Sequence, residues 1–220
     1  MSSVINFFIQ VTPTNNDPKV VASFYLNAVK TWGAPQVLRT DCGTENTITS
    51  AIQSEIRQSM AAHVYGTSQH NQRIEALWSK LKQSVIQEWA SFFPQLTASD
   101  IVHEGEVEET AVLRFCFMGL VQQSLDNFMR YWNTHNIVQT SDSPGGVPDI
   151  LFYAGPSLHL IPSPVSIQQA EEYIEMPTIT GSADFDEFLQ LIMDQQLLTM
   201  PQTKDEAVLL FDKLCPYMKQ

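Results

Sequence analysis

The sequence predicts an α/β fold followed by an α-helical C-terminal segment. Three observations predict it: short β-branched runs alternate with helical patterns in the first half of the chain, turn signals separate them, and only helical spacing follows residue 161. An order of strand, helix, strand, helix, strand and long helix is typical of open α/β sheets. In such sheets the working residues gather at the carboxyl ends of the strands.

The first two elements are a strand and a capped helix. The run VINFFIQV, Val4 to Val11, predicts a buried strand, and the turn-forming residues PTNNDP that follow it predict the end of that strand. A helix then begins with Asn16 or Asp17 as its N-cap and Pro18 in the first helical position, and Gly33 ends it. Its apolar face comprises Val20, Val21, Phe24, Tyr25, Ala28 and Val29.

Two further short strands flank the next helix. Residues 36–40, after Pro35, predict a strand that ends at Asp41, and residues 61–66, AAHVYG, predict another. Between them a helix runs from Thr44 to about Met60, because Ile48, Ile52 and Ile56 recur every four residues.

The strongest helical pattern is SQHNQRIEALWSKLKQSVIQEW, residues 68–89. Its apolar residues follow spacings of three, four and seven: Ile74, Leu77, Trp78, Leu81, Val85 and Trp89. Because Trp78 and Trp89 both fall on this stripe, we expect both indole rings in the core rather than stacked on bases.

The remaining chain reads as helices joined by polar connectors. Residues 99–109 predict a loop or a helix entry, 110–135 a second long helix, and SDSPGGVPD, 141–149, a turn-rich connector. Three short helices are expected at about 165–175, 184–198 and 203–218.

The charge is uneven along the chain. The formal net charge is -12, yet residues 1–90 hold seven basic and six acidic residues, whereas residues 91–220 hold five basic and 18 acidic ones. Phosphate contacts need lysine and arginine, and the span between Arg130 and Lys204 has neither. Any contact with DNA should therefore come from the first half.

The cysteines and the N-terminal residues indicate the cellular compartment in which the protein is expected. Cys42, Cys116 and Cys215 are far apart and have no metal-ligand spacing, which favours free thiols in a reducing compartment. The apolar run FCFMGLV is too short to span a bilayer, and no basic segment precedes the first apolar run. We therefore expect an intracellular protein without a membrane partner.

Two acids are the candidate metal ligands. Asp41 ends its strand, and Glu75 lies in the first turn of the long amphipathic helix, so an intervening strand and helix can bring both carboxylates together. Mg²⁺ prefers oxygen ligands and usually takes one or two carboxylates with waters and phosphate oxygens. Lys82 shares the helix face of Glu75, with Arg73 and Lys80 beside it, which suits a nucleic-acid backbone.

Two stretches resemble the retroviral-type integrase core domain, as found in integrases and integrase-derived transposon genes. They are NNDPKVVASFYLNAVKTWGAPQVLRTDCGTEN and SQHNQRIEALWSKLK. The resemblance continues through FMRYWNTHNI and PGGVPDILF, so it covers about residues 4 to 153. The pair of signatures is specific, because the two occur close to the spacing of the family, whereas either alone is weak.

The resemblance implies an RNase H-like fold and an Mg²⁺- or Mn²⁺-dependent DNA strand-transfer site made of two aspartates and a glutamate. Asp41 matches the second aspartate and Glu75 the glutamate. Arg73, Lys80, Lys82 and Asn71 would contact DNA. It also implies a nuclear protein and a possible homodimer.

No residue of this sequence matches the family's first aspartate, which lies on a strand upstream of Val4. Asp17 should point away from Asp41, and Glu45 fits a helix-dipole role better than a metal ligand. We therefore expect an incomplete RNase H-like sheet that lacks its first two strands, in residues 1–155, and impaired DDE-type polynucleotidyl transfer.

The alternative is a non-enzymatic interaction or scaffold protein. Residues 156–220 form the acidic helical C-terminal segment, and in it Ala183 to Met200 carries apolar residues with acids between them. This segment either recruits a protein partner by lying in its groove or packs on its own domain, and we favour the packing.

Overall fold

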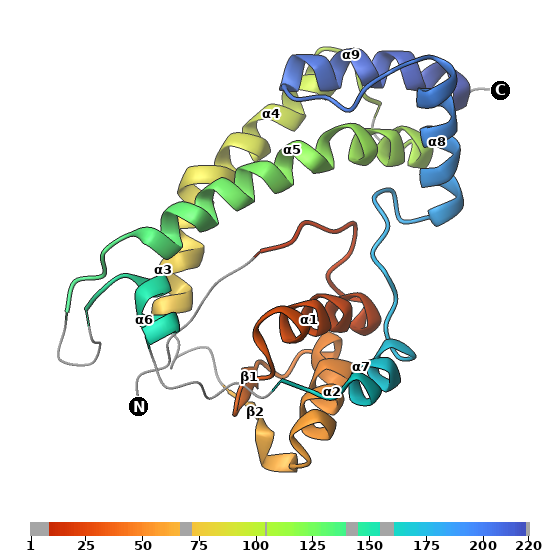
Figure 1. Ribbon diagram of the computed structural model, residues 1–220. Coiled ribbons are helices and arrows are strands. Elements are labelled where there is room, and N and C mark those ends of the chain that lie inside the picture. Colours follow the sequence, from red (N-terminus) through yellow and green to blue (C-terminus); the bar gives the residue numbers. More distant parts are fainter. Residues whose placement is uncertain (1–8, 67–71, 104, 140–144, 155–160, 219–220) are drawn as a thin grey trace. The chain divides into compact units, whose positions relative to one another are not determined.

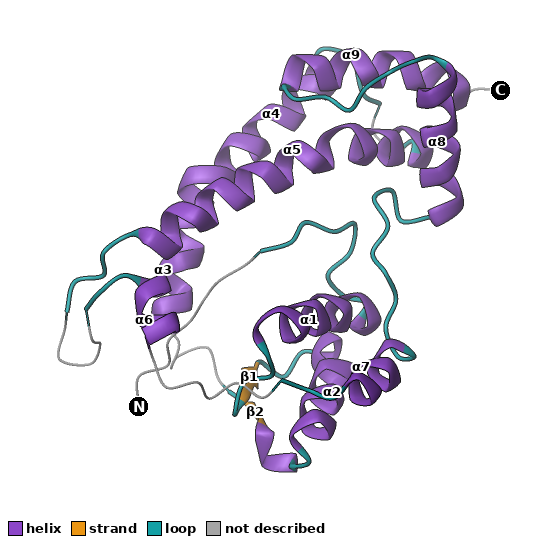
Figure 2. Ribbon diagram, in the orientation of Figure 1, coloured by secondary structure: helices purple, strands orange, loops and turns teal. Residues whose placement is uncertain are grey.

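The computed structural model describes residues 9–66, 72–103, 105–139, 145–154 and 161–218 (Figure 1). Helices predominate, and one small parallel sheet accompanies them (Figure 2). The chain forms two compact units. Unit 1 comprises residues 1–13, 73–155 and 178–220, and unit 2 comprises residues 14–72 and 156–177.

Unit 2 begins with helix α1, Pro18–Trp32, whose ends follow local sequence signals. Asp17 is the N-cap, and its Oδ1 accepts a hydrogen bond from the Lys19 amide at 2.8 Å. Gly33, with φ of 84°, ends the helix and donates its amide to the Val29 carbonyl. The predicted Pro18 start and Gly33 end are confirmed.

A strand, helix, strand sequence follows α1. Strand β1, Leu38–Thr40, pairs in parallel with β2, His63–Tyr65, with Leu38 opposite His63 and Thr40 opposite Tyr65. Between them lie the 3-10 turn η1, Thr44–Asn46, the helix α2, Thr47–Arg57, and the 3-10 turn η2, Met60–Ala62. The mixed α/β character is confirmed, and the larger RNase H-like sheet stays a prediction.

A buried polar network joins α1, α2 and the chain that enters both strands. The Gln53 side-chain amide donates to the Pro35 carbonyl at 2.8 Å and to the Ala62 carbonyl at 3.1 Å. The Tyr25 hydroxyl donates to Gln53 Oε1, and burial raises the pKa of that hydroxyl. Arg57 Nε donates to the Pro35 carbonyl at 2.8 Å. The network fixes where β1 and β2 begin.

Helix α7, Pro164–Glu171, completes unit 2. Ser163 caps it, and the Glu171 carboxylate forms an ion pair with Lys30 of α1 at 2.6 Å. The main buried apolar cluster of the unit consists of small and aliphatic residues: Ala22, Leu26, Val29, Ala34, Ile52, Ile56 and Ala170.

Unit 1 is mainly helical in its described part, with one antiparallel bridge between Ile137 and Gly146. Its elements are α3, Gln72–Leu81, a π-helical turn, Lys82–Ile86, α4, Gln87–Ala98, α5, Val107–Thr134, α6, Pro148–Ala154, α8, Ala183–Gln195, α9, Lys204–Leu214, and the 3-10 turn η5, Cys215–Met218. Helix α6 was not predicted from the sequence. Helix α4 extends beyond Trp89, where the pattern of the predicted long helix ended.

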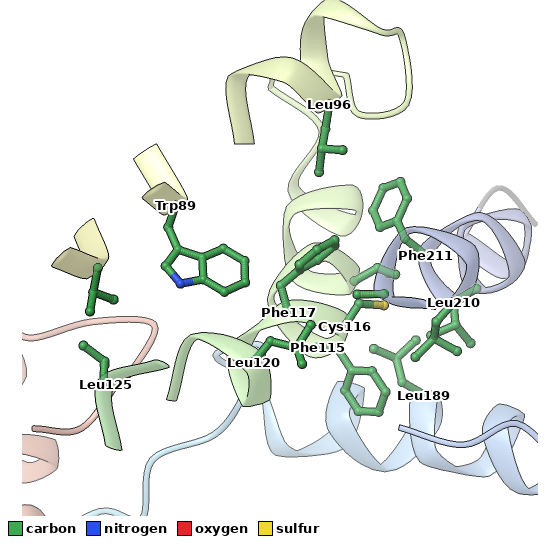
Figure 3. Close-up of a cluster of buried hydrophobic side chains, with 14 of the residues drawn as sticks. Trp89, Leu96, Phe115, Cys116, Phe117, Leu120, Leu125, Leu189, Leu210 and Phe211 are labelled. Atoms are coloured by element: carbon green, nitrogen blue, oxygen red, sulfur yellow. The ribbon is translucent and has the colours of Figure 1, made fainter. Parts of the chain in front are cut away.

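The core of unit 1 is large and partly aromatic (Figure 3). Phe117 of α5 is buried against Phe92 and Phe93 of α4, with ring centroids 5.6 Å away in both pairs, and Trp89 lies 6.4 Å away. Buried residues from the C-terminal helices join them: Leu189, Ile192, Met193, Ala207, Leu210, Phe211 and Leu214. The C-terminal helices therefore pack on their own domain.

The predicted strand at Val4 to Val11 is wrong in its described part. Residues 4–8 lie outside the described residues, and residues 9–11 form no strand. The side-chain amide of Gln122 in α5 instead accepts from the Val11 amide at 2.8 Å and donates to the Ile9 carbonyl at 2.9 Å. A glutamine side chain thus takes the place of a neighbouring strand.

The two units are defined by packing, and each draws residues from both sides of position 155. The division into consecutive domains 1–155 and 156–220 therefore stays a prediction. Among the helices that the structure describes, none is long and apolar enough to cross a membrane.

Candidate functional site

Asp41 follows directly after β1, at the carboxyl edge of the small parallel sheet. Its side chain is exposed, and Oδ1 accepts from the Asn46 side-chain amide at 2.8 Å and, more weakly, from the Gly43 amide at 3.4 Å. Within the described part of the chain, Oδ2 forms no hydrogen bond. One carboxylate oxygen is thus held by the turn, while the other is available to a ligand.

His63 lies beside the end of β1. The Thr40 hydroxyl donates to the Asp41 carbonyl at 2.9 Å, and its oxygen lies 3.0 Å from His63 Nε2. Because that hydroxyl has a single proton, the Nε2–H of His63 is the donor in the second contact. Desolvation lowers the pKa of His63, so its ring favours the neutral form. The ring also packs edge-on against Tyr65.

Glu45 lies in the first turn of η1. Its carboxylate folds back over Gly43, where an added Cβ would lie 2.1 Å from Glu45 Oε1. This position agrees with the expected role at a helix start.

The exposed face of α3 and the π-helical turn carries the second acid. Glu75, in the first turn of α3, is exposed, as are Lys80 and Lys82, while Leu77, Leu81 and Val85 on the other face are buried. In the part of the chain that the structure describes, Lys80 and Lys82 form no ion pair. Both ammonium groups are therefore available to an anionic partner.

Trp78 lies on this exposed face, which corrects the prediction that it belongs to the core. Its side chain is 51% exposed, whereas Trp89 is 6% exposed. The buried residues Leu77, Leu81 and Val85 recur every four positions, and Trp78 lies one position beyond that stripe. Glu75, Trp78 and Lys82, at spacings of three and seven, share one side of the helix.

The other predicted DNA contacts are described only in part. Asn71 lies outside the described residues, and only the backbone of Arg73, within α3, is described. Their DNA contacts stay predictions.

The meeting of Asp41 and Glu75 also stays a prediction. Asp41 belongs to unit 2 and Glu75 to unit 1, and each unit is described by itself. The described residues contain no group of three or more histidine, cysteine, aspartate or glutamate side chains that could hold a metal ion. The donor chemistry nevertheless suits a hard divalent cation, because both groups are exposed carboxylates.

The hydrogen bonds that support the strand before Asp41 were not predicted. Gln53 joins Pro35 to Ala62, positions that flank the two strands. A polar residue between Ile52 and Ile56 of an amphipathic helix is the only local signal that could have suggested it.

A family described as an integrase core domain matches residues 1–175. The match includes both signatures and extends to α7, but not to α8 and α9. No curated protein matches the chain. No solved structure matches it either.

Proposed function

The chain belongs to the integrase core domain family, and from this premise we propose that it derives from a mobile element and retains a DNA-binding, metal-binding remnant of a polynucleotidyl transferase site. In this proposal Asp41 and Glu75 bind Mg²⁺ or Mn²⁺. Lys80, Lys82, Arg73 and Asn71 contact the DNA backbone.

The observation that carries the proposal is the composition of the exposed side of α3. A carboxylate, an indole and an ammonium group, from Glu75, Trp78 and Lys82, lie along it without partners among the described residues. A cation at Glu75 would attract a phosphate, Lys82 would bind the next one, and the Trp78 ring offers a flat surface to a base or sugar.

The hydrogen bonding of the Asp41 carboxylate also supports the proposed metal site. Asn46 and Gly43 orient its carboxylate through Oδ1 and leave Oδ2 for a ligand. When bound, a divalent ion supplies Lewis-acid polarisation of the phosphoryl oxygen. The residues of this chain would hold that ion, orient the phosphate and screen its charge.

We propose that residues 1–220 by themselves transfer strands poorly. The family site uses three carboxylates, and Asp41 and Glu75 are the two that this sequence matches. Two carboxylates would bind the ions weakly, because clamping the attacking and leaving oxygens relies on the full ligand set.

DNA nicking and strand transfer with Mg²⁺ or Mn²⁺ test this proposal. Wild type is compared with Asp41→Asn and Glu75→Gln, with Glu187→Gln, an exposed acid of α8, as the matched control. We expect low activity that both site variants abolish and the control keeps. Equal activity in all four proteins would remove these carboxylates from the mechanism.

Metal binding is measured separately by thermal melting. A ligand that binds only the folded state raises the melting temperature. We expect millimolar Mn²⁺ to raise it in wild type and in Glu187→Gln but not in Asp41→Asn. No rise in wild type would refute metal binding by residues 1–220.

DNA binding is tested by its dependence on salt. Lys82→Gln should flatten the slope of log affinity against log salt concentration by about 1, as expected for the loss of one phosphate contact. Trp78→Leu should weaken binding while leaving that slope unchanged. Nuclear location and a homodimer are further proposals, to be checked by imaging of the tagged chain and by sedimentation.

We also propose a second candidate function, a non-enzymatic scaffold that recruits a protein through its acidic C-terminal helices. The observation that favours it is that α8 and α9 follow the family match and keep large apolar side chains exposed. A metal-induced rise in melting temperature that Asp41→Asn abolishes would favour the first candidate over this one.

A further inference from the structure

The packing of unit 1 does not explain the position of Trp78. Its side chain is 51% exposed, and among the described residues no other ring lies against it. Trp89, later in the same helical stretch, is 6% exposed, and its ring centroid lies 5.6–6.4 Å from those of three phenylalanines. Trp132 of α5 likewise packs against Phe128 and His135. The exposure of Trp78 therefore needs an explanation outside the core.

The groups beside Trp78 on its helix are charged. Glu75 lies three residues before it and Lys82 four residues after it, so all three share one side of the helix. Lys82 is exposed and forms no ion pair in the described part of the chain. Its ammonium group lies within about one helical turn of the indole, so one ligand can contact both.

Charge complementarity favours a nucleic acid over a protein as the ligand of this side. Charged residues are depleted from the centres of protein interfaces, because burying an unpaired charge is costly. A protein that covered the Trp78 ring would also bury Lys82 or Glu75. A phosphate strand instead supplies the partner that the Lys82 ammonium group lacks.

A DNA duplex offers little to an indole ring. In B-form DNA the flat faces of the bases are stacked on one another, and only the edges of the bases are open in the grooves. Those edges are read through paired donors and acceptors, whereas the indole has one N–H donor and no acceptor. A duplex can therefore contact Trp78 only through its sugars and phosphates.

An unpaired base, by contrast, has an open flat face. Stacking of a base on an aromatic side chain strengthens binding by about 5–150-fold, and every base can stack in this way. Lysine contacts alone favour the duplex, because its phosphate charge is denser than that of a single strand. A preference for single strands must therefore come from the ring.

We propose that Trp78 makes this chain bind single-stranded DNA more tightly than duplex DNA, by stacking on an unpaired base while Lys82 holds a neighbouring phosphate. Trp78 thus determines which form of DNA the helix face accepts. This inference rests on the DNA binding proposed above, and it names the class of DNA. It does not depend on a metal ion, because the indole and the ammonium group contact the DNA directly.

The test measures the affinity of the full chain for a labelled oligonucleotide and for its blunt duplex, by fluorescence anisotropy in buffer without divalent ions. We expect wild type to bind the single strand more tightly. Trp78→Leu should bind the single strand about 5–150-fold more weakly and the duplex at most slightly more weakly, so that the preference disappears. Tyr153→Leu is the matched control, because Tyr153 is a 71% exposed aromatic residue of α6, and it should change neither affinity.

Two further variants separate stacking from charge. Trp78→Phe keeps an aromatic ring, so it should keep the preference for the single strand. Lys82→Gln removes a charge that both forms of DNA use, so it should weaken both affinities to a similar extent. Tryptophan emission gives a second readout: the single strand should quench it in wild type and in Tyr153→Leu, and much less in Trp78→Phe.

Two results would overturn the inference and leave the proposed DNA binding standing. One is that wild type binds the duplex as tightly as the single strand or more tightly. The other is that Trp78→Leu weakens both affinities equally, which would show that the indole supports the helix rather than a base. No binding of either form by wild type would refute the proposed DNA binding and this inference together.

Discussion

The two units are stabilised by different kinds of interaction. Unit 1 buries large aromatic and aliphatic side chains of α3, α4, α8 and α9 around α5, whereas unit 2 buries mainly alanine, valine, leucine and isoleucine around a hydrogen-bonded Gln53. Unit 2 also leaves apolar side chains of its small sheet exposed, Val64 at 40% and Tyr65 at 50%. The helix that carries Glu75 therefore rests on a larger apolar core than the strand that leads to Asp41.

We infer from this difference that the two parts of the site proposed above can change independently. The position of Glu75 depends on apolar area, which tolerates many substitutions of similar volume. The position of β1, which leads to Asp41, depends on a few directional hydrogen bonds of Gln53, and the loss of that side chain leaves buried polar groups unpaired. We expect a mutation to destabilise mainly the unit that carries it, and we expect the loss of stability to differ between the two units.

The largest effect is expected from Phe117→Ala in unit 1. Phe117 is 1% exposed and contacts the rings of Phe92 and Phe93, so its truncation leaves a cavity that should cost about 3–5 kcal/mol of unfolding free energy. Denaturant unfolding measures the loss. Phe188→Ala, at a site that is 42% exposed, is the control and should cost much less. Equal losses would contradict the importance of the aromatic cluster.

A smaller loss, confined to unit 2, is expected from Gln53→Ala. The Pro35 and Ala62 carbonyls and the Tyr25 hydroxyl would each lose a partner, which should cost about 1–3 kcal/mol. Hydrogen exchange should quicken in α1 and α2 while α5 stays protected. Gln168→Ala is the control, because Gln168 is exposed on α7. It should change neither the unfolding free energy nor the rates of hydrogen exchange. Uniform quickening across both units would show that they unfold together.

The smallest effect is expected from the pH dependence of unit 2. Because desolvation depresses the pKa of folded His63 below its ordinary 6.5, the unfolded chain takes up a proton first as the pH falls. The contribution of neutral His63 to the unfolding free energy is therefore fully present above pH 6.5 and is lost as the pH falls below that value. Hydrogen exchange of β2 at two pH values measures this, and His63→Gln should remove the difference. A gain in stability on acidification would show that the sign is wrong.

Local signals predicted the helices well. Asp17, Pro18 and Gly33 fixed the ends of α1, because caps act through neighbours a few residues away. The spacing of Leu189 and Ile192 likewise predicted a helix near residue 184. Helix α6 was missed, since its few residues, PDILFYA, are too short to show a period.

Features that depend on distant parts of the chain could not be predicted. Gln122 takes up the backbone of Ile9 and Val11, which are more than 100 positions away, and the sequence around VINFFIQV indicates only a strand. Trp78 fits the apolar period, yet it is exposed, because the buried stripe of its helix is narrower than the run of apolar residues. For the site, the motifs predict Asp41 and Glu75 as metal ligands, and this stays a prediction because their separation depends on how the two units are placed.

The π-helical turn at Lys82–Ile86 has a consequence for the evolution of this helix. Buried residues at 77, 81, 85 and 89 recur every four positions, and in a regular α-helix of 3.6 residues per turn such a stripe would drift around the axis by about 40° at each step. The wider turn offsets part of that drift, as one inserted residue would. Because the π-turn absorbs one extra residue with little net rotation, deleting Ser84 should restore a regular helix and leave the orientation of Glu75 relative to Trp89 nearly unchanged. One amino acid can thus be gained or lost within this turn while the acid of the signature keeps its direction.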